Sequence, residues 1–203
     1  MRALNLALAL AASAVAGQAA ATTYVFDAFL TGPNESPPVA SPGTGFSKLF
    51  LDTDAHTMRV TITFEDLIGL TTMAHVHAPT ADPNTGTIGV ATELPSFTGF
   101  PLGVQAGTYD HTFDTTLLST WSAGFVTANG GTALGAETAF LNALLAEKAY
   151  INIHTDFVRS GEIRDFYAQV PEPGTWALMI AGFGLTGAIL RRGVATTARK
   201  LTT

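Results

Sequence analysis

Between positions 57 and 65, apolar and polar residues alternate without a break. A period of two residues is that of a β-strand, in which successive side chains point to opposite faces of the sheet. One face of this strand is therefore expected in a core and the other in water, as in an antiparallel sheet. The inward set is Met58, Val60, Ile62 and Phe64, and the outward set is Arg59, Thr61, Thr63 and Glu65.

Other short apolar runs between Gly- and Pro-rich turns have the same character. They predict strands at 23–31, 43–52, 73–78, 87–94, 109–114, 150–155 and 161–168. Apolar residues at helical spacing predict two helical inserts, at 115–122 and 136–148. This pattern is typical of a mostly β protein, an antiparallel β-sandwich with one or two short helices.

The N-terminal residues 1–21 have the pattern of a secretory signal peptide. Met1 and Arg2 form a positive start, positions 4–15 are apolar apart from Asn5 and Ser13, and Ala19–Ala21 gives a small-residue cleavage site. We therefore expect export through the Sec translocon and a mature domain spanning residues 22–170.

The C-terminal region carries a second membrane signal. A rigid break at Pro171-Glu172-Pro173 precedes an uncharged apolar segment at 175–190, which Arg191 and Arg192 close. Sixteen helical residues span about 24 Å, close to the length of a short transmembrane helix. The arginine pair predicts that residues 193–203 form a cytoplasmic tail and that the domain lies outside.

The composition of residues 22–170 excludes several classes of function. Five Lys and Arg stand against fifteen Asp and Glu, a net charge near −10, so nucleic acid is not an expected partner. The absence of cysteine excludes disulfides, thiolate catalysis and cysteine-ligated zinc. No nucleophile-elbow or phosphate-loop pattern occurs, and we expect no enzymatic activity.

Three histidines are placed to meet. His75 and His77 lie on one strand and point to the same face, about 7 Å apart. His154 lies on the strand 150–155, and a turn at 157–161 would bring the next strand, with Glu162 and Arg164, alongside it. Three imidazoles suffice for a copper or zinc site with an open position. The alternative is a buried hydrogen-bond network of neutral histidines that fixes the sandwich.

Three motifs in order resemble the CHRD domain, a family named from chordin. They are the stretches 32–39 (GPNESPPV), 74–77 (AHVH) and 149–155 (AYINIHT), the last followed by GEIR at 161–164. The resemblance implies an immunoglobulin-like β-sandwich and adds Glu35 to the candidate site. The His-x-His strand and the later arginine are also distantly similar to copper-zinc superoxide dismutases, an analogy that does not by itself imply their function.

Residues 170–192 closely resemble the PEP-CTERM sorting signal of Gram-negative bacteria. That resemblance implies processing by an exosortase near Pro171–Pro173, after a stage in the inner membrane, and transfer to the cell surface or release. A plain C-terminal anchor is what the residues alone indicate.

Two functions are therefore expected. The first is a non-enzymatic module of the cell surface or extracellular matrix, associated with exopolysaccharide. The alternative is a metal-binding envelope protein that uses His75, His77 and His154 and is redox-active, with a superoxide-dismutase-like activity as its enzymatic form.

Overall fold

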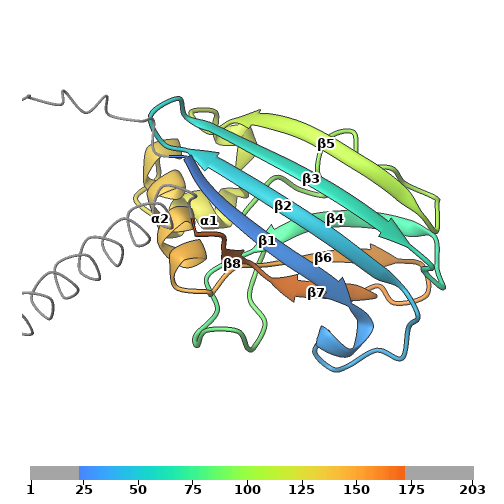
Figure 1. The fold of residues 1–203 in the computed structure, drawn as a ribbon. Coiled ribbons are helices and arrows are strands. Elements are labelled where there is room, and N and C mark those ends of the chain that lie inside the picture. The colour runs from blue at the N-terminus through green and yellow to red at the C-terminus, as the bar shows by residue number, and fades with distance from the viewer. Residues whose placement is uncertain (1–22, 172–203) are drawn as a thin grey trace, which may run out of the picture.

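A computed structural model describes residues 23–171, which form one curled antiparallel sheet with helices at one end (Figure 1). The strands are β1 (Thr23–Thr31), β2 (Thr44–Asp52), β3 (Thr57–Glu65), β4 (Thr71–His77), β5 (Gly107–Asp114), β6 (Tyr150–Thr155), β7 (Ile163–Phe166) and β8 (Ala168–Gln169). The helices are η1 (Gly32–Asn34), η2 (Leu118–Thr120), α1 (Ala123–Ala128) and α2 (Ala133–Leu145). The predicted mostly β, antiparallel fold is confirmed.

The strands follow the order β4-β6-β7-β1-β2-β3-β5, and β8 pairs with β1. β1, β2 and β3 pair in register over their full lengths, from Thr23↔Asp52 to Thr44↔Glu65. The alternation in β3 has the predicted effect, because Met58, Val60 and Ile62 are at most 1 % exposed. The sheet curls so that the apolar faces of β4, β6 and β7 and those of β1, β2, β3 and β5 enclose one core.

The edge strand β4 is covered by residues 90–97, which overlap the regular strand predicted at 87–94. Only isolated bridges form there, at Val90 and Thr92. The Thr92 hydroxyl accepts the Val76 N–H, and the Ser96 hydroxyl accepts the Ala74 N–H. The backbone N–H groups of Ala91 and Phe97 donate in turn to the Val76 and Ala74 carbonyls. Side-chain and backbone bonds together leave no free edge on this stretch of β4.

The helical inserts differ from their predicted positions. At 115–122 there is only the short η2, and α1 follows because the Ser122 side chain caps it by accepting the Phe125 N–H. α2 begins three residues before the expected start, since Thr132 accepts the Gly135 N–H. It ends before Lys148, where Glu147 takes a positive φ of 57° and the Lys148 N–H bonds to the Ala143 carbonyl.

The predicted signal peptide (residues 1–21), the apolar segment 175–190 and the tail 193–203 lie outside the described residues. Within residues 23–171, no helix has the length and apolar character needed to cross a membrane.

Candidate metal centre

The three predicted histidines meet on the outer face of β4 and β6. The two strands pair antiparallel, with His75 opposite Asn152 and Met73 opposite His154. Ala74 and Val76 on β4, like their counterparts on β6, point into the core, so the histidines take the other face. The ring centroid of His75 lies 4.7 Å from that of His77 and 4.6 Å from that of His154.

Although they lie outside the sandwich core, the three imidazoles are buried. His75 is 3 % exposed, His154 6 % and His77 9 %. Loops fold over this face and bring backbone carbonyls to the rings. The Ile88 carbonyl oxygen lies 2.7 Å from His77 Nδ1, and the Arg159 carbonyl oxygen lies 2.8 Å from His154 Nδ1.

These two carbonyls decide the tautomers. A carbonyl oxygen only accepts, so Nδ1 carries the proton in both His77 and His154, and Nε2 keeps its lone pair. Histidine ligands of metals are typically held in this way, by donating the other ring N–H to an oxygen. His77 Nε2 lies 3.1 Å from the Asn152 side-chain oxygen. Because a neutral imidazole carries only one proton, a lone pair on Nε2 requires the Asn152 amide to be turned so that its NH2 group faces the ring.

Two ring nitrogens of the cluster have no partner. Among the described residues, His75 Nδ1 and His154 Nε2 are buried without any hydrogen bond. A buried polar atom left in this state costs about 1–3 kcal/mol. One donor atom from each of the three histidines lies within 4.8 Å of the others. Nitrogens that share an ion at about 2.0 Å stand roughly 3.5 Å apart, so shifts of about 1 Å complete a site.

The electrostatics keep the histidines neutral. Burial, with a smaller contribution from the neighbouring histidines, lowers the pKa of His75 to about 3 and that of His77 to about 4. Burial also lowers the pKa of His154. A neutral imidazole is the form that binds a metal, so the site needs to release few protons on loading at neutral pH.

Arg164 and Glu35 lie behind the cluster, as predicted. The Arg164 guanidinium lies 4.8 Å from the Tyr150 ring centroid, and Tyr150 stacks on His77 at 4.6 Å. Arg164 Nε donates to the Asn34 carbonyl and lies 3.8 Å from a Glu35 oxygen. Burial raises the pKa of Glu35 to about 7, against the opposing effect of Arg164.

Gly161 makes room for this second layer. Its φ of 126° suits glycine alone, and a Cβ atom there would collide with Glu35 Oε1. The carboxyl oxygen Oε1 has no hydrogen-bond partner in the part of the chain described. Any side chain at position 161 would therefore displace Glu35.

Glu162 belongs to a different network, which corrects the prediction that it supports the histidines. Its carboxylate accepts from the hydroxyls of Ser41 and Thr155 and from the N–H groups of Ile68 and Gly69. The reason is that β7 begins at Ile163, so residue 162 does not follow the alternation of the strand. It joins loops at the sheet end instead.

The remaining histidines lie apart from the cluster. His111 is a half-buried residue of β5, and His56 Nδ1 lies 3.1 Å from the carboxylate of Glu137. Glu137, on α2, is 2 % exposed and also accepts from the Thr115 hydroxyl. Sequence reasoning also missed Ile88 and Arg159, because they act through backbone carbonyls that no side-chain pattern reveals.

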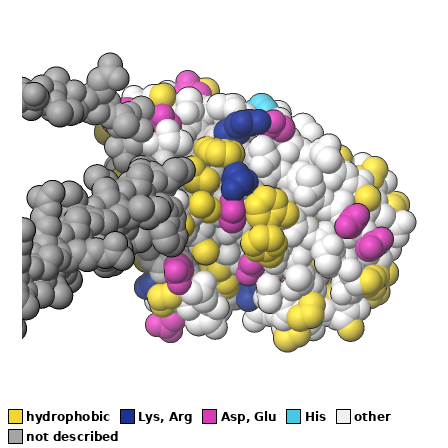
Figure 2. All heavy atoms as spheres, viewed as in Figure 1, with side chains coloured by type: hydrophobic (Ala, Val, Ile, Leu, Met, Phe, Trp, Pro, Cys, Tyr) yellow, Lys and Arg dark blue, Asp and Glu magenta, His cyan; other side chains and the backbone are white. Residues whose placement is uncertain are grey.

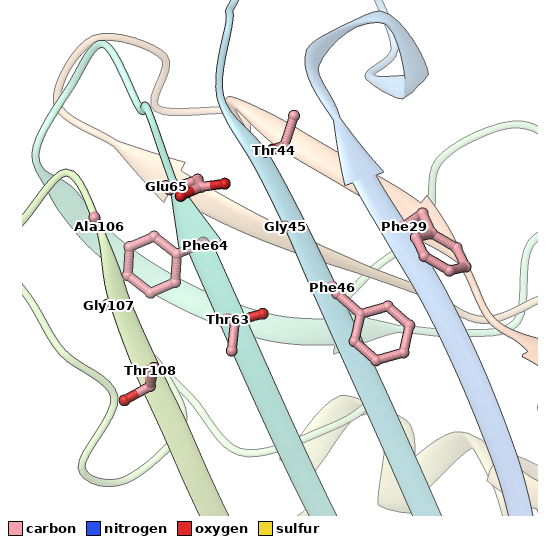
Figure 3. A pocket seen from close by; sticks show the side chains of 10 residues that line it. All are labelled: Phe29, Thr44, Gly45, Phe46, Thr63, Phe64, Glu65, Ala106, Gly107 and Thr108. Carbon is pink, nitrogen blue, oxygen red and sulfur yellow. The ribbon is translucent and has the colours of Figure 1, made fainter.

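A second feature lies on the opposite half of the sheet. Phe29 on β1 and Phe46 on β2 stand side by side in a shallow groove, with ring centroids 4.8 Å apart (Figure 3). Phe29 is 65 % exposed, and Thr44, Thr63 and Glu65 line the same groove. Figure 2 shows hydrophobic side chains gathered on this face with charged side chains among them.

Comparison with known proteins assigns both parts of the chain. The CHRD domain family matches residues 26–166, and the PEP-CTERM protein-sorting motif matches residues 169–192. No curated protein and no solved structure matches the chain. The sorting motif marks proteins for exosortase-dependent sorting to the cell surface. The chain belongs to the CHRD family and is exported as an exosortase substrate.

Proposed function

We propose that this protein is an exported module of the cell surface that holds one copper or zinc ion on His75, His77 and His154 and has no catalytic activity of its own. The observation that carries the proposal is the pair of buried, unpartnered nitrogens, His75 Nδ1 and His154 Nε2. A hydrogen-bond network that served only to fix the sandwich would satisfy these atoms. An ion accepts both lone pairs and removes the cost of burying them.

The burial of the rings favours a site that holds a metal ion over a site that uses the ion in catalysis. A catalytic metal keeps a position open to water or substrate, whereas these imidazoles are 3–9 % exposed. A superoxide-dismutase-like reaction would require the covering loops to open.

The test uses the full chain, purified in mild detergent, stripped with a chelator and then incubated with Cu or Zn ions. Elemental analysis after desalting is expected to give about one ion per chain in the wild type. The His75→Ala/His77→Ala variant should bind none, while the control His111→Gln, outside the cluster, should bind as the wild type does. A wild type that stays metal-free with both ions would refute the proposal, and a variant that merely loses stability would then favour the structural network.

A polysaccharide-associated role is the second candidate, and the groove at Phe29 and Phe46 favours it. The exposed ring of Phe29 and the half-buried ring of Phe46, beside threonine hydroxyls, suit the apolar faces and hydroxyls of sugars. Co-sedimentation of the wild type and of Phe29→Ala with purified exopolysaccharide tests this role. The exposed Leu117, changed to Ala, is the control. Equal sedimentation of all three proteins would count against the groove.

Processing is proposed to follow Sec export and a stage in the inner membrane, with residues 175–190 as the anchor. Mass spectrometry of the surface protein is expected to show a chain that ends near Pro171–Pro173. Mature protein that still carries residues 176–192, in a host with an exosortase, would contradict this route.

A further inference from the structure

The three-histidine cluster supplies no negative charge to an ion. All three imidazoles are neutral ligands, and no carboxylate joins them among residues 23–171. A dication bound there would keep its full charge of two in a buried site, whereas a monocation would keep a charge of one. The cost of burying an ion rises with the square of its charge, so the difference between the two is large.

A buried, positively charged side chain lies against one of the cluster's neighbours. Arg164 is 4 % exposed and lies over Tyr150, the ring that stacks on His77. Its closest acid, Glu35, is 3.8 Å away and can offset only the guanidinium. The two side chains together add no net negative charge to the surroundings of the site.

The number of ligands points the same way. Zinc in structural sites takes four ligands in a tetrahedron, and in catalytic sites it takes three plus a water. The described residues offer three imidazoles, in a face where the rings are almost fully covered. Imidazole is a ligand that suits copper, and cuprous copper, a monocation, needs no fourth ligand.

We propose that the site selects Cu(I) over Zn(II), and that the positive charge of Arg164 enforces part of this choice. The inference rests on the proposed metal-binding function and narrows it to one ion. Arg164 is not a ligand in this proposal, because it contacts Tyr150 and the loops. It acts on the site through its charge.

The experiment titrates the full chain anaerobically, with ascorbate, against chelators that buffer free Cu(I) and free Zn(II). At equal free concentrations we expect Cu(I) to occupy the site and Zn(II) to be bound at least about a hundredfold more weakly. Comparable or tighter Zn(II) binding would overturn this inference and leave the proposed function standing. Binding of neither ion would overturn both.

Three further variants isolate the effect of the charge. Arg164→Met should raise Zn(II) affinity relative to Cu(I) by about tenfold, while Arg164→Lys, which keeps the charge, should change the ratio little. Glu35→Gln, which keeps the shape and leaves the guanidinium uncompensated, should shift the ratio further toward Cu(I). If Arg164→Met fails to fold, the Glu35→Gln result decides. A ratio unmoved by these charge changes would overturn the role of Arg164.

Discussion

Replacing Glu162 with glutamine changes one atom type at a fully buried junction of loops and strands. The carboxylate is 0 % exposed and accepts four hydrogen bonds. Oε1 takes the Ser41 hydroxyl and the Ile68 N–H, and Oε2 takes the Thr155 hydroxyl and the Gly69 N–H. These donors hold its pKa below the ordinary value, despite the opposing effect of burial.

The magnitude follows from the donors. A hydroxyl can turn and accept from the new NH2 group, but a backbone N–H cannot. Whichever way the new side-chain amide is oriented, one N–H, of Ile68 or of Gly69, faces a donor. An orphaned buried donor costs about 1–3 kcal/mol, and the remaining bonds lose their charge-assisted strength. We therefore expect a loss of about 2–4 kcal/mol in the free energy of unfolding.

The assay is urea unfolding followed by far-UV circular dichroism, with thermal melts alongside. For a domain of this size the loss corresponds to a fall in Tm of roughly 5–15 °C. Glu65→Gln, at an exposed end of β3, is the matched control and should change stability by less than about 0.5 kcal/mol. If the Glu162 and Glu65 variants were equally stable, the hydrogen-bond reasoning would be refuted.

Two more predictions concern stability. In the metal-free protein, stability should fall as the pH drops below about 6.5. The unfolded chain takes up protons there that folded His75 and His77, with pKa values of about 3 and 4, do not. Each histidine contributes up to about 1.4 kcal/mol per pH unit. The pKa of Glu35 is raised from 4.5 to about 7, so between about pH 7 and about pH 4.5 this residue offsets part of the loss of stability. Urea midpoints that stay constant from about pH 6.5 to about pH 4.5 would contradict the prediction. Phe140→Ala empties a site that is 0 % exposed and should cost about 3–5 kcal/mol in urea unfolding, against about 0.5 kcal/mol or less for Leu134→Ala, which is 60 % exposed. Similar losses for the two would show that Phe140 is not a core residue.

Most strands could be predicted because period-two alternation reports burial directly. The range 23–31 was predicted to the residue, and β2 and β5 differ from prediction by one or two positions at their starts. The strand predicted at 87–94 was wrong. An apolar run does not show whether its backbone will form a full ladder with an edge strand or only isolated bridges. The helix predicted at 136–148 begins and ends three residues earlier in the structure. Its N-cap, Thr132, lies outside the apolar stripe on which the prediction was based.

Part of the candidate site could also be predicted from the alternation of side chains along the strands. Alternation placed His75 and His77 on one face and His154 on the face of its own strand, and the turn at 157–161 made β6 and β7 neighbours. The pairing of β4 with β6 joins segments about 75 residues apart, which local patterns do not specify. Glu162 was misplaced because it precedes its strand.

The sequence by itself determined that the protein is exported, that it is a β domain of the CHRD family and which histidines share a face, because targeting signals and alternation are local properties of the chain. Only the tertiary structure decided that loops bury those histidines on the outside of the sandwich. It also decided that two backbone carbonyls fix the tautomers of His77 and His154 and that two nitrogens are left without partners among the described residues. Those features depend on contacts between distant segments, and the chemistry proposed for the site follows from them.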